Sequence, residues 1–204
     1  MTSSEFGAVL RARAGRLDIV LSESEVLGFE AYFRLLSEWN STINLTALPL
    51  SAPTDETFDR LLIEPLTAAS LVEKTESQWF DLGSGGGSPA IPLKIVRPMQ
   101  RLVMVESKER KAAFLREAVR VLKLEGVHVV TGRFQDLPGT RNAHLVTARA
   151  VRPDAELFTV AAKLLSSEGR LLIFHSRPEE LAHPGFVRVP GAPSIAVFHV
   201  EQTR

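Results

Sequence analysis

The sequence contains no cysteine, and this absence excludes several kinds of chemistry. A chain without thiols has no thiolate nucleophile, no CxxC redox pair and no sulfur-ligated zinc or iron–sulfur site. The five histidines show neither HxxxH nor HExxH spacing, so we expect no histidine metal site. No stretch approaches the roughly 18 consecutive apolar residues of a membrane helix, and residues 1–5 do not read as a signal peptide. We therefore expect a soluble, cytoplasmic protein that binds no metal.

The net charge of zero conceals an uneven distribution of charge along the chain. Residues 1–75 carry 6 Lys and Arg against 11 Asp and Glu, whereas residues 76–204 carry 18 against 13. Residues 94–123 alone carry nine basic and three acidic side chains. A basic segment on a neutral protein is typical of a surface that receives a polyanion, although a solvated helix face gives the same pattern.

Two patterns of apolar residues divide the chain near residue 76. Before this point, helical spacing predicts one helix over 24–42 and another from 54 or 55 to about 72. After it, short apolar runs alternate with helical segments. The expected helices are 89–97, 108–123 and 154–166, and the expected strands are 78–82, 102–106, 127–131, 145–148 and 170–175.

Strands that alternate with helices favour right-handed βαβ crossovers and a parallel sheet. The last runs, 186–189 and 195–200, have no helix between them and predict a closing antiparallel strand pair. We therefore expect an α/β fold, a doubly wound Rossmann-like sheet over residues 76–204 with a helical N-terminal cap over residues 1–75.

The segment after the first expected strand carries the most chemistry in the chain. The dinucleotide pattern GxGxxG fails when counted from Gly83, because Ser88 stands at its last glycine position. The frame DxGxGxG fits without exception as Asp81, Gly83, Gly85 and Gly87. An acid that leads such a loop suits a cofactor with a cationic amine, which S-adenosylmethionine has and NAD lacks.

The second expected strand ends in an acid, Glu106. An acid at this place accepts hydrogen bonds from the ribose hydroxyls of an adenosyl group. Together the loop and Glu106 favour a cofactor that contains adenosine. A glycine-rich turn beside a helix-capping acid is the alternative without a ligand.

Five blocks of sequence occur in the order of a known family. They are Trp39-Asn40 with Asn44-Leu45-Thr46-Ala47, the loop from Asp81 to Leu93, Glu106-Ser107 with Arg110-Lys111 and Phe114-Leu115, Gly132 to Asp136, and Arg149-Ala150-Val151. Over nearly its whole length the chain resembles the small-subunit ribosomal RNA guanine-N7 methyltransferases, the RsmG or GidB family. A glycine loop alone is a weak signal, whereas five blocks in order are specific.

The resemblance implies a class I methyltransferase fold, S-adenosylmethionine as cofactor and N7 of one guanine in 16S-type ribosomal RNA as acceptor. It places the methionine end of the cofactor against the loop from Gly83 to Ser88 and the ribose on Glu106. It places Phe134 and Gln135 beside the adenine. Arg149, at the end of the fourth strand, is expected to face the cofactor carboxylate or the incoming RNA.

Several positions depart from the family pattern. Where the family has R-H-I-L-D-S, this chain has Arg60-Leu61-Leu62-Ile63-Glu64-Pro65. Where the family has K-G and R-H, this chain has His175-Ser176 and Pro193-Ser194. In addition, Gln135 replaces an acid and Ala90 replaces a glycine. The cofactor half therefore follows the pattern better than the half expected to face RNA. Two alternatives stay open: a methyltransferase that acts on a small molecule or a protein, and a non-catalytic module that keeps the cofactor site.

The expected helix over 108–123 presents three basic residues, Arg116, Arg120 and Lys123, along one outer ridge. Because contacts to the phosphate backbone dominate RNA affinity, this ridge is a candidate phosphate track. The chain has one tyrosine and no exposed aromatic platform for single-stranded bases, so recognition is expected to depend on RNA shape or on the assembled particle. We expect a monomer that acts on the small ribosomal subunit or its RNA.

Overall fold

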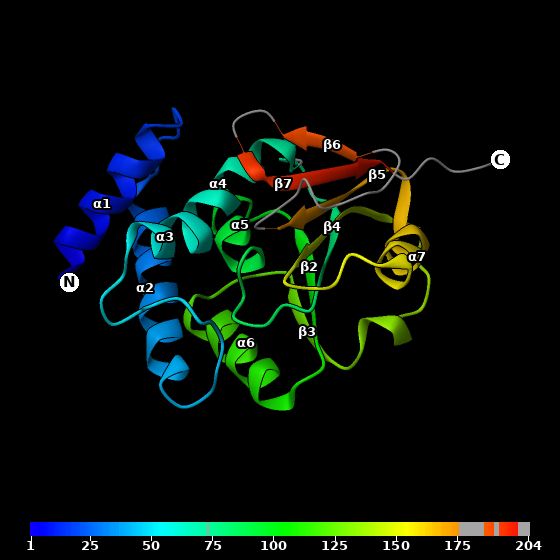
Figure 1. Cartoon of the computed structure of the whole chain (residues 1–204), viewed down its shortest axis with the longest axis horizontal. Helices are drawn as coiled ribbons and strands as arrows, with labels where there is room; N and C mark the ends of the chain where they lie inside the picture. Colours follow the sequence, from blue (N-terminus) through cyan, green and yellow to red (C-terminus); the bar gives the residue numbers. More distant parts are fainter. Residues whose placement is uncertain (73, 176–185, 190–191, 200–204) are drawn as a thin grey trace.

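The fold is built on a mixed sheet with β1 near its centre. A computed structural model describes residues 1–72, 74–175, 186–189 and 192–199 (Figure 1). Within these residues seven strands lie in the order β3-β2-β1-β4-β5-β7-β6. The strands are β1 (Gln78–Leu82), β2 (Arg101–Glu106), β3 (Val127–Thr131), β4 (Ala143–Arg149), β5 (Leu165–Phe174), β6 (Phe186–Val189) and β7 (Ala192–His199).

The first five strands are parallel to one another, and β7 runs antiparallel to both of its neighbours, β5 and β6. The chain runs outward from β1 to β3, returns to β4 on the other side of β1, and continues to β5. This reversal is the topological switch point of a doubly wound sheet, where ligands bind at the carboxyl ends of the strands. The predicted fold class and the closing antiparallel pair are confirmed, although residue 200 lies outside the described residues.

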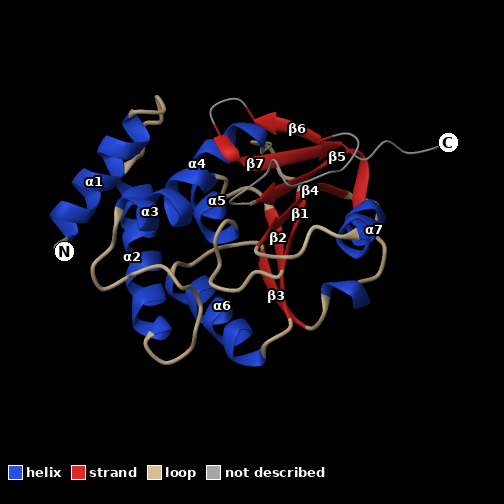
Figure 2. Cartoon of the chain, viewed as in Figure 1, coloured by secondary structure: helices blue, strands red, loops and turns tan. Residues whose placement is uncertain are grey.

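Helices cover both faces of the sheet (Figure 2). The helices after β1 are α5 (Ala90–Val96), α6 (Glu109–Val121) and α7 (Ala155–Leu164), close to the predicted ranges. One hydrophobic cluster joins the N-terminal helices, α5 and α6 to the sheet face that carries Trp79. A second cluster joins α7 to the opposite face, which carries Phe80. The neighbouring residues Trp79 and Phe80 of β1 thus pack into the hydrophobic clusters on opposite faces of the sheet, because side chains alternate between the two faces along a strand.

Two N-terminal helices are fixed by capping boxes. Thr2 begins α1 (Ser3–Gly15) and Ser22 begins α2 (Glu23–Asn40), and in each case a glutamate three residues later completes the reciprocal cap. The α2 helix confirms the prediction over 24–42, whereas α1 had no counterpart among the predicted helices. Because these helices share one hydrophobic cluster with the sheet, they form part of the same core; the division into residues 1–75 and 76–204 stays a prediction.

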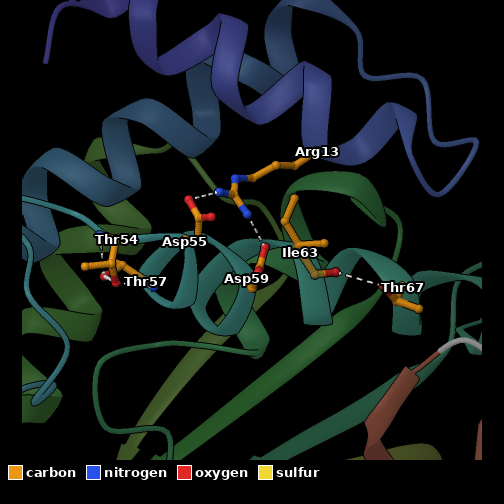
Figure 3. Close-up of polar contacts among 7 residues, drawn as sticks. All are labelled: Arg13, Thr54, Asp55, Thr57, Asp59, Ile63 and Thr67. Carbon is orange, nitrogen blue, oxygen red and sulfur yellow. Dashed lines mark hydrogen bonds and ion pairs between the residues drawn. The ribbon is translucent and has the colours of Figure 1, made fainter.

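The second predicted N-terminal helix is present but is not uniformly α-helical. It consists of α3 (Asp55–Phe58), the π-helical turn η1 (Asp59–Ile63), α4 (Glu64–Ala68) and the short 3₁₀ turn η2 (Ala69–Leu71). Figure 3 shows its outer side, where Arg13 of α1 pairs with Asp55 and, at 2.6 Å, with Asp59. The π-helical turn therefore has one side fixed to α1.

Candidate functional site

A cavity of about 980 Å³ lies at the carboxyl ends of the parallel strands, where the topology places a ligand site. Its walls come from the loop after β1, the end of β2, the segment after β3, the end of β4 and the N-terminal loop 44–49. Seven predicted cofactor residues line it, namely Gly83, Gly85, Ser88, Glu106, Phe134, Gln135 and Arg149. The two other predicted residues, Asp81 and Gly87, are not among the described residues that line the cavity.

The glycine loop needs backbone conformations that other residues rarely adopt. Gly83, Gly85 and Gly87 all have positive φ, at 72°, 49° and 85°. A Cβ at Gly83 would stand 2.7 Å from Val151, and one at Gly87 would stand 2.5 Å from Ile91. The N–H of Gly83 also donates to the carbonyl of Val105 in β2 at 2.9 Å. The loop is therefore held on the sheet in a shape that leaves no room for a side chain at Gly83 or Gly87.

Asp81 is buried beneath this loop with one carboxylate oxygen unpartnered. Thr147 of β4 donates to Asp81 Oδ1 at 2.5 Å, and Trp79 donates to the Thr147 hydroxyl at 2.9 Å. Asp81 Oδ2 accepts no hydrogen bond from any described residue. Burial raises the pKa of Asp81 to about 6; the hydroxyls of Ser84 and Thr147 and the charge of Arg149 partly offset this effect. A buried acceptor without a donor fits the cationic amine of S-adenosylmethionine.

Glu106 connects the ends of β1 and β2. Its Oε2 accepts from the Gly85 N–H at 2.9 Å, and its Oε1 accepts from the Lys108 N–H at 2.8 Å. Each carboxylate oxygen keeps a second lone pair, so both can still accept from ribose hydroxyls. Glu106 thus orders the glycine loop, and its lone pairs fit the predicted ribose contact.

The two residues predicted beside the adenine lie in a short 3₁₀ turn, η3 (Phe134–Asp136), directly after β3. Both line the cavity. The Gln135 amide donates to Glu156 of α7 at 3.0 Å. Half-buried Phe134 packs against the cluster beneath α7, so it presents an apolar wall to the site.

Arg149 ends β4 and points toward the N-terminal helices rather than toward open solvent. Its Nη2 pairs with Glu64 at 2.8 Å, and its Nη1 donates to the carbonyl of Arg60. The guanidinium lies 4.8 Å from the centre of the Phe174 ring. Its Nε is buried and has no partner among the described residues. Burial lowers the pKa of Arg149, with Glu64 acting against this shift.

The N-terminal segment supplies contacts that the sequence analysis did not identify as part of the site. The hydroxyl of buried Tyr32 donates to the carbonyl of Gly86 at 2.7 Å. Asn40, a member of the first of the five family blocks, accepts from the N–H groups of Leu45 and Thr46. These bonds fix loop 44–49 against the cavity. The Asn40 and Asn44 block pointed to this region, whereas Tyr32 gave no sequence signal beyond helical spacing.

The predicted phosphate ridge lies along α6 and just beyond it. Its three basic side chains are exposed, but none is among the described residues that line the cavity. Arg116 donates to Thr131 at 2.5 Å, and Arg120 pairs with Glu117 at 2.7 Å. Lys108 and Lys111, at the start of the same helix, do line the cavity. Basic side chains therefore stand both at the cavity end of α6 and farther along the helix, interspersed with Glu109 and Glu117.

Two further properties concern the described part of the chain. No helix there combines the length and apolar character that crossing a bilayer requires. The same ranges, which omit residues 73, 176–185, 190–191 and 200–204, hold no group of three or more His, Asp or Glu side chains placed to bind a metal ion.

The fold is similar to those of solved proteins that bind adenosyl compounds. MtNAS in complex with MTA and tNA superimposes with a TM-score of 0.55 at 17% identity, covering 87% of this chain and 73% of that chain. Coclaurine N-methyltransferase bound to N-methylheliamine and SAH gives a TM-score of 0.50 at 12% identity, covering 85% and 60%. These likenesses support the class I methyltransferase fold and say nothing of the acceptor.

Sequence comparison is more specific. The proteins named "Ribosomal RNA small subunit methyltransferase G" from Neisseria meningitidis serogroup A and Pelotomaculum thermopropionicum are 35% and 36% identical to this chain. The matches cover 78% and 81% of this chain, and 75% and 69% of those proteins. The family model "GidB: rRNA small subunit methyltransferase G" matches residues 26–183. The chain with this glycine loop and cavity belongs to the GidB family of rRNA small subunit methyltransferases.

Proposed function

We propose that this protein transfers a methyl group from S-adenosylmethionine to N7 of a guanine in the 16S-type RNA of the small ribosomal subunit. Family membership supports the reaction class and the RNA acceptor. The observation that carries the proposal is the cavity at the switch point, with the glycine loop on one side and an unpartnered Asp81 oxygen beneath it.

The residues divide the work of cofactor binding. Asp81 takes the amine of the methionine end, Arg149 takes its carboxylate, and Glu106 takes the ribose. The loop from Gly83 to Ser88 lies along the methionine chain, while Phe134 and Gln135 border the adenine. S-adenosylmethionine supplies a methyl group bound to a positively charged sulfur. This methyl carbon is electrophilic without further activation.

The acceptor chemistry requires little from the protein beyond positioning. Guanine N7 has an in-plane lone pair and loses no proton before attack, so no general base is needed. What the cavity must provide is alignment of N7 with the methyl group and exclusion of water. Loop 44–49 and Arg60 form part of the cavity wall, and we place the base against them.

We propose that Arg116, Arg120 and Lys123 contact RNA phosphates outside the cavity. Lys108 and Lys111 support this placement, because they line the cavity at the start of the helix that carries Arg116 and Arg120. A monomeric, cytoplasmic enzyme remains the expectation.

One observation favours a different acceptor. Leu61 lines the cavity where the family pattern has histidine, so the wall is more apolar there than the pattern predicts. A methyltransferase with a small-molecule or protein acceptor is therefore the second candidate function.

The direct test is transfer of tritiated methyl from S-adenosylmethionine to small-subunit particles that lack their guanine-N7 mark, with the labelled position mapped. Label at one guanine N7 is the expected result. Cofactor binding without label in naked RNA or in particles would overturn the RNA acceptor and direct the search to the second candidate or to a non-catalytic role.

A further inference from the structure

The π-helical turn η1 exposes two backbone carbonyls beside the cavity. The Glu64 N–H donates to the carbonyl of Asp59, five residues earlier, instead of to Arg60 as in an α-helix. Pro65 has no N–H, so Leu61 lacks the donor that an α-helix would provide four residues later. The carbonyls of Arg60 and Leu61 are thus left without their α-helical donors.

Residues of the cavity supply replacement donors. Arg149 Nη1 donates to the Arg60 carbonyl, and Ser88 Oγ donates to the Leu61 carbonyl at 2.9 Å. Both donors line the cavity. The distortion of the helix therefore forms two direct links between the N-terminal segment and the cofactor site, as π-helical turns often do at functional sites.

Glu64 forms the third link between the helical segment and the cofactor site, an ion pair with Arg149. Its carboxylate lies 2.8 Å from Arg149 Nη2, and the two side chains are only 22% and 13% exposed. With Phe174 against the guanidinium, the arginine is held from three sides, by a carbonyl, a carboxylate and a ring. Only its Nε–H is buried without a described partner.

We propose that Glu64 is a positioning residue that orients the Arg149 guanidinium for the carboxylate of the cofactor's methionine end. This inference rests on the proposed function, because it assigns a task to Glu64 at the same cofactor site. Charge-assisted hydrogen bonds depend strongly on geometry, and an arginine side chain without a fixed partner adopts many rotamers. Removing the Glu64 charge leaves the Arg60 carbonyl and the Phe174 ring as the described contacts of Arg149, so the guanidinium is less firmly oriented. The glycine loop and Asp81 keep their own contacts.

The experiment compares two ligands that differ in the part Arg149 recognises. S-adenosylhomocysteine carries the amino-acid end, whereas 5′-methylthioadenosine lacks it. Wild-type protein, Glu64→Gln and Glu64→Asp are titrated with both ligands by calorimetry. Glu64→Gln is expected to weaken S-adenosylhomocysteine binding about tenfold and methylthioadenosine binding less than about twofold, with partial recovery in Glu64→Asp.

Asp59→Asn is the matched control. Asp59 lies on the same π-helical turn, but its carboxylate pairs with Arg13 on the outer side (Figure 3). This variant also loses one ion pair from the segment, and it is expected to bind both ligands as the wild type does.

The ratio of the two affinities separates the outcomes. Equal weakening of both ligands in Glu64→Gln, or no weakening, overturns the positioning role while the proposed function stands. If wild-type protein binds neither ligand, the proposed function itself fails. Because both ligands are measured on one protein sample, partial unfolding of a variant lowers both affinities and does not imitate the expected result.

Discussion

The hydroxyl of Tyr32 in α2 donates a hydrogen bond to the carbonyl of Gly86 in the cofactor loop, across 54 positions of sequence and at 2.7 Å. Tyr32 is fully buried, and the carbonyl of Leu45 lies close to the same glycine. The middle of the loop is therefore shaped by the N-terminal segment, and its ends by β1 and β2.

Tyr32→Phe removes this bond and keeps the packing of the ring. Because the Gly86 carbonyl then loses its donor, unfolding free energy is expected to fall by about 1–2 kcal/mol. Affinity for S-adenosylhomocysteine is expected to fall several-fold as the loop relaxes. Urea denaturation and calorimetric titration measure the two effects.

Thr67→Val provides the comparison. It removes a hydroxyl that donates to the Ile63 carbonyl at 3.0 Å, and this bond does not involve the cofactor loop (Figure 3). Its affinity is expected to match the wild type. Unchanged affinity in Tyr32→Phe as well would show that the loop keeps its shape without α2.

Cofactor affinity should depend on pH through Asp81, because burial raises the pKa of this carboxyl to about 6. Below this pH the carboxyl is protonated in the free protein and must lose its proton to pair with the cofactor amine. Affinity for S-adenosylhomocysteine is thus expected to be constant above about pH 7 and to fall by up to about tenfold per unit below pH 6.

Two controls identify the group responsible for this pH dependence. Methylthioadenosine lacks the cationic amine of the amino-acid end, so it should bind independently of pH over the same range. Asp81→Asn should bind S-adenosylhomocysteine weakly at every pH. A pH dependence that persists in Asp81→Asn would show that another group is responsible. For the free protein the sign is opposite: the Asp81 contribution to folding stability falls as pH rises from about 4 to 6.

Gly87→Ala is expected to damage both folding and the site. The residue has a φ of 85°, and an added Cβ would meet Ile91 at 2.5 Å. Left-handed backbone strain and the clash together are expected to cost about 2–4 kcal/mol, measured by chemical denaturation. Gly15→Ala, in open space at the end of α1, should leave stability unchanged or slightly higher. Wild-type stability in Gly87→Ala would contradict the assigned loop conformation.

Replacing Arg116, Arg120 and Lys123 by alanine tests the proposed phosphate ridge. Methyl transfer to small-subunit particles is expected to fall at least about tenfold at moderate salt, with a weaker salt dependence, because counterion release is lost. Affinity for S-adenosylhomocysteine should stay within twofold. A triple alanine variant of Arg11, Arg16 and Arg34 makes the same charge change on the N-terminal helices. Equal activity of the two variants would remove the reason for placing RNA on α6.

Much of the fold was predictable because its signals are local. The strand 78–82 and the strand 127–131 are apolar runs of the right length, and both have the predicted bounds. The α1 helix was missed because Arg11 and Arg13 interrupt a weak apolar pattern, although Thr2 and Glu5 form a capping box that marks its start. The fifth strand begins at Leu165 rather than 170, because its first residues continue the helical pattern of α7.

The site was predictable only where its residues are close in sequence or follow strand ends. The glycine loop and Glu106 meet this condition, since parallel strands deliver them to one edge. The partners of Arg149 do not, because Glu64 lies 85 positions away on a segment whose helical pattern hides a π-helical turn. Thr147 faces Asp81 through the register of β1 with β4, which no single strand reveals.

The hydroxyl of Ser88 donates to the backbone carbonyl of Leu61, and every amino acid at position 61 would provide this carbonyl. The side chain at position 61 can therefore change the character of the cavity wall while the attachment of the loop to the helix is preserved. Pro65 is the residue that this attachment does depend on, because restoring an N–H there would offer the Leu61 carbonyl a competing donor. In this protein position 61 can therefore vary and alter the acceptor surface, whereas position 65 is constrained because it protects the attachment of the cofactor loop. The two positions belong to one helical turn.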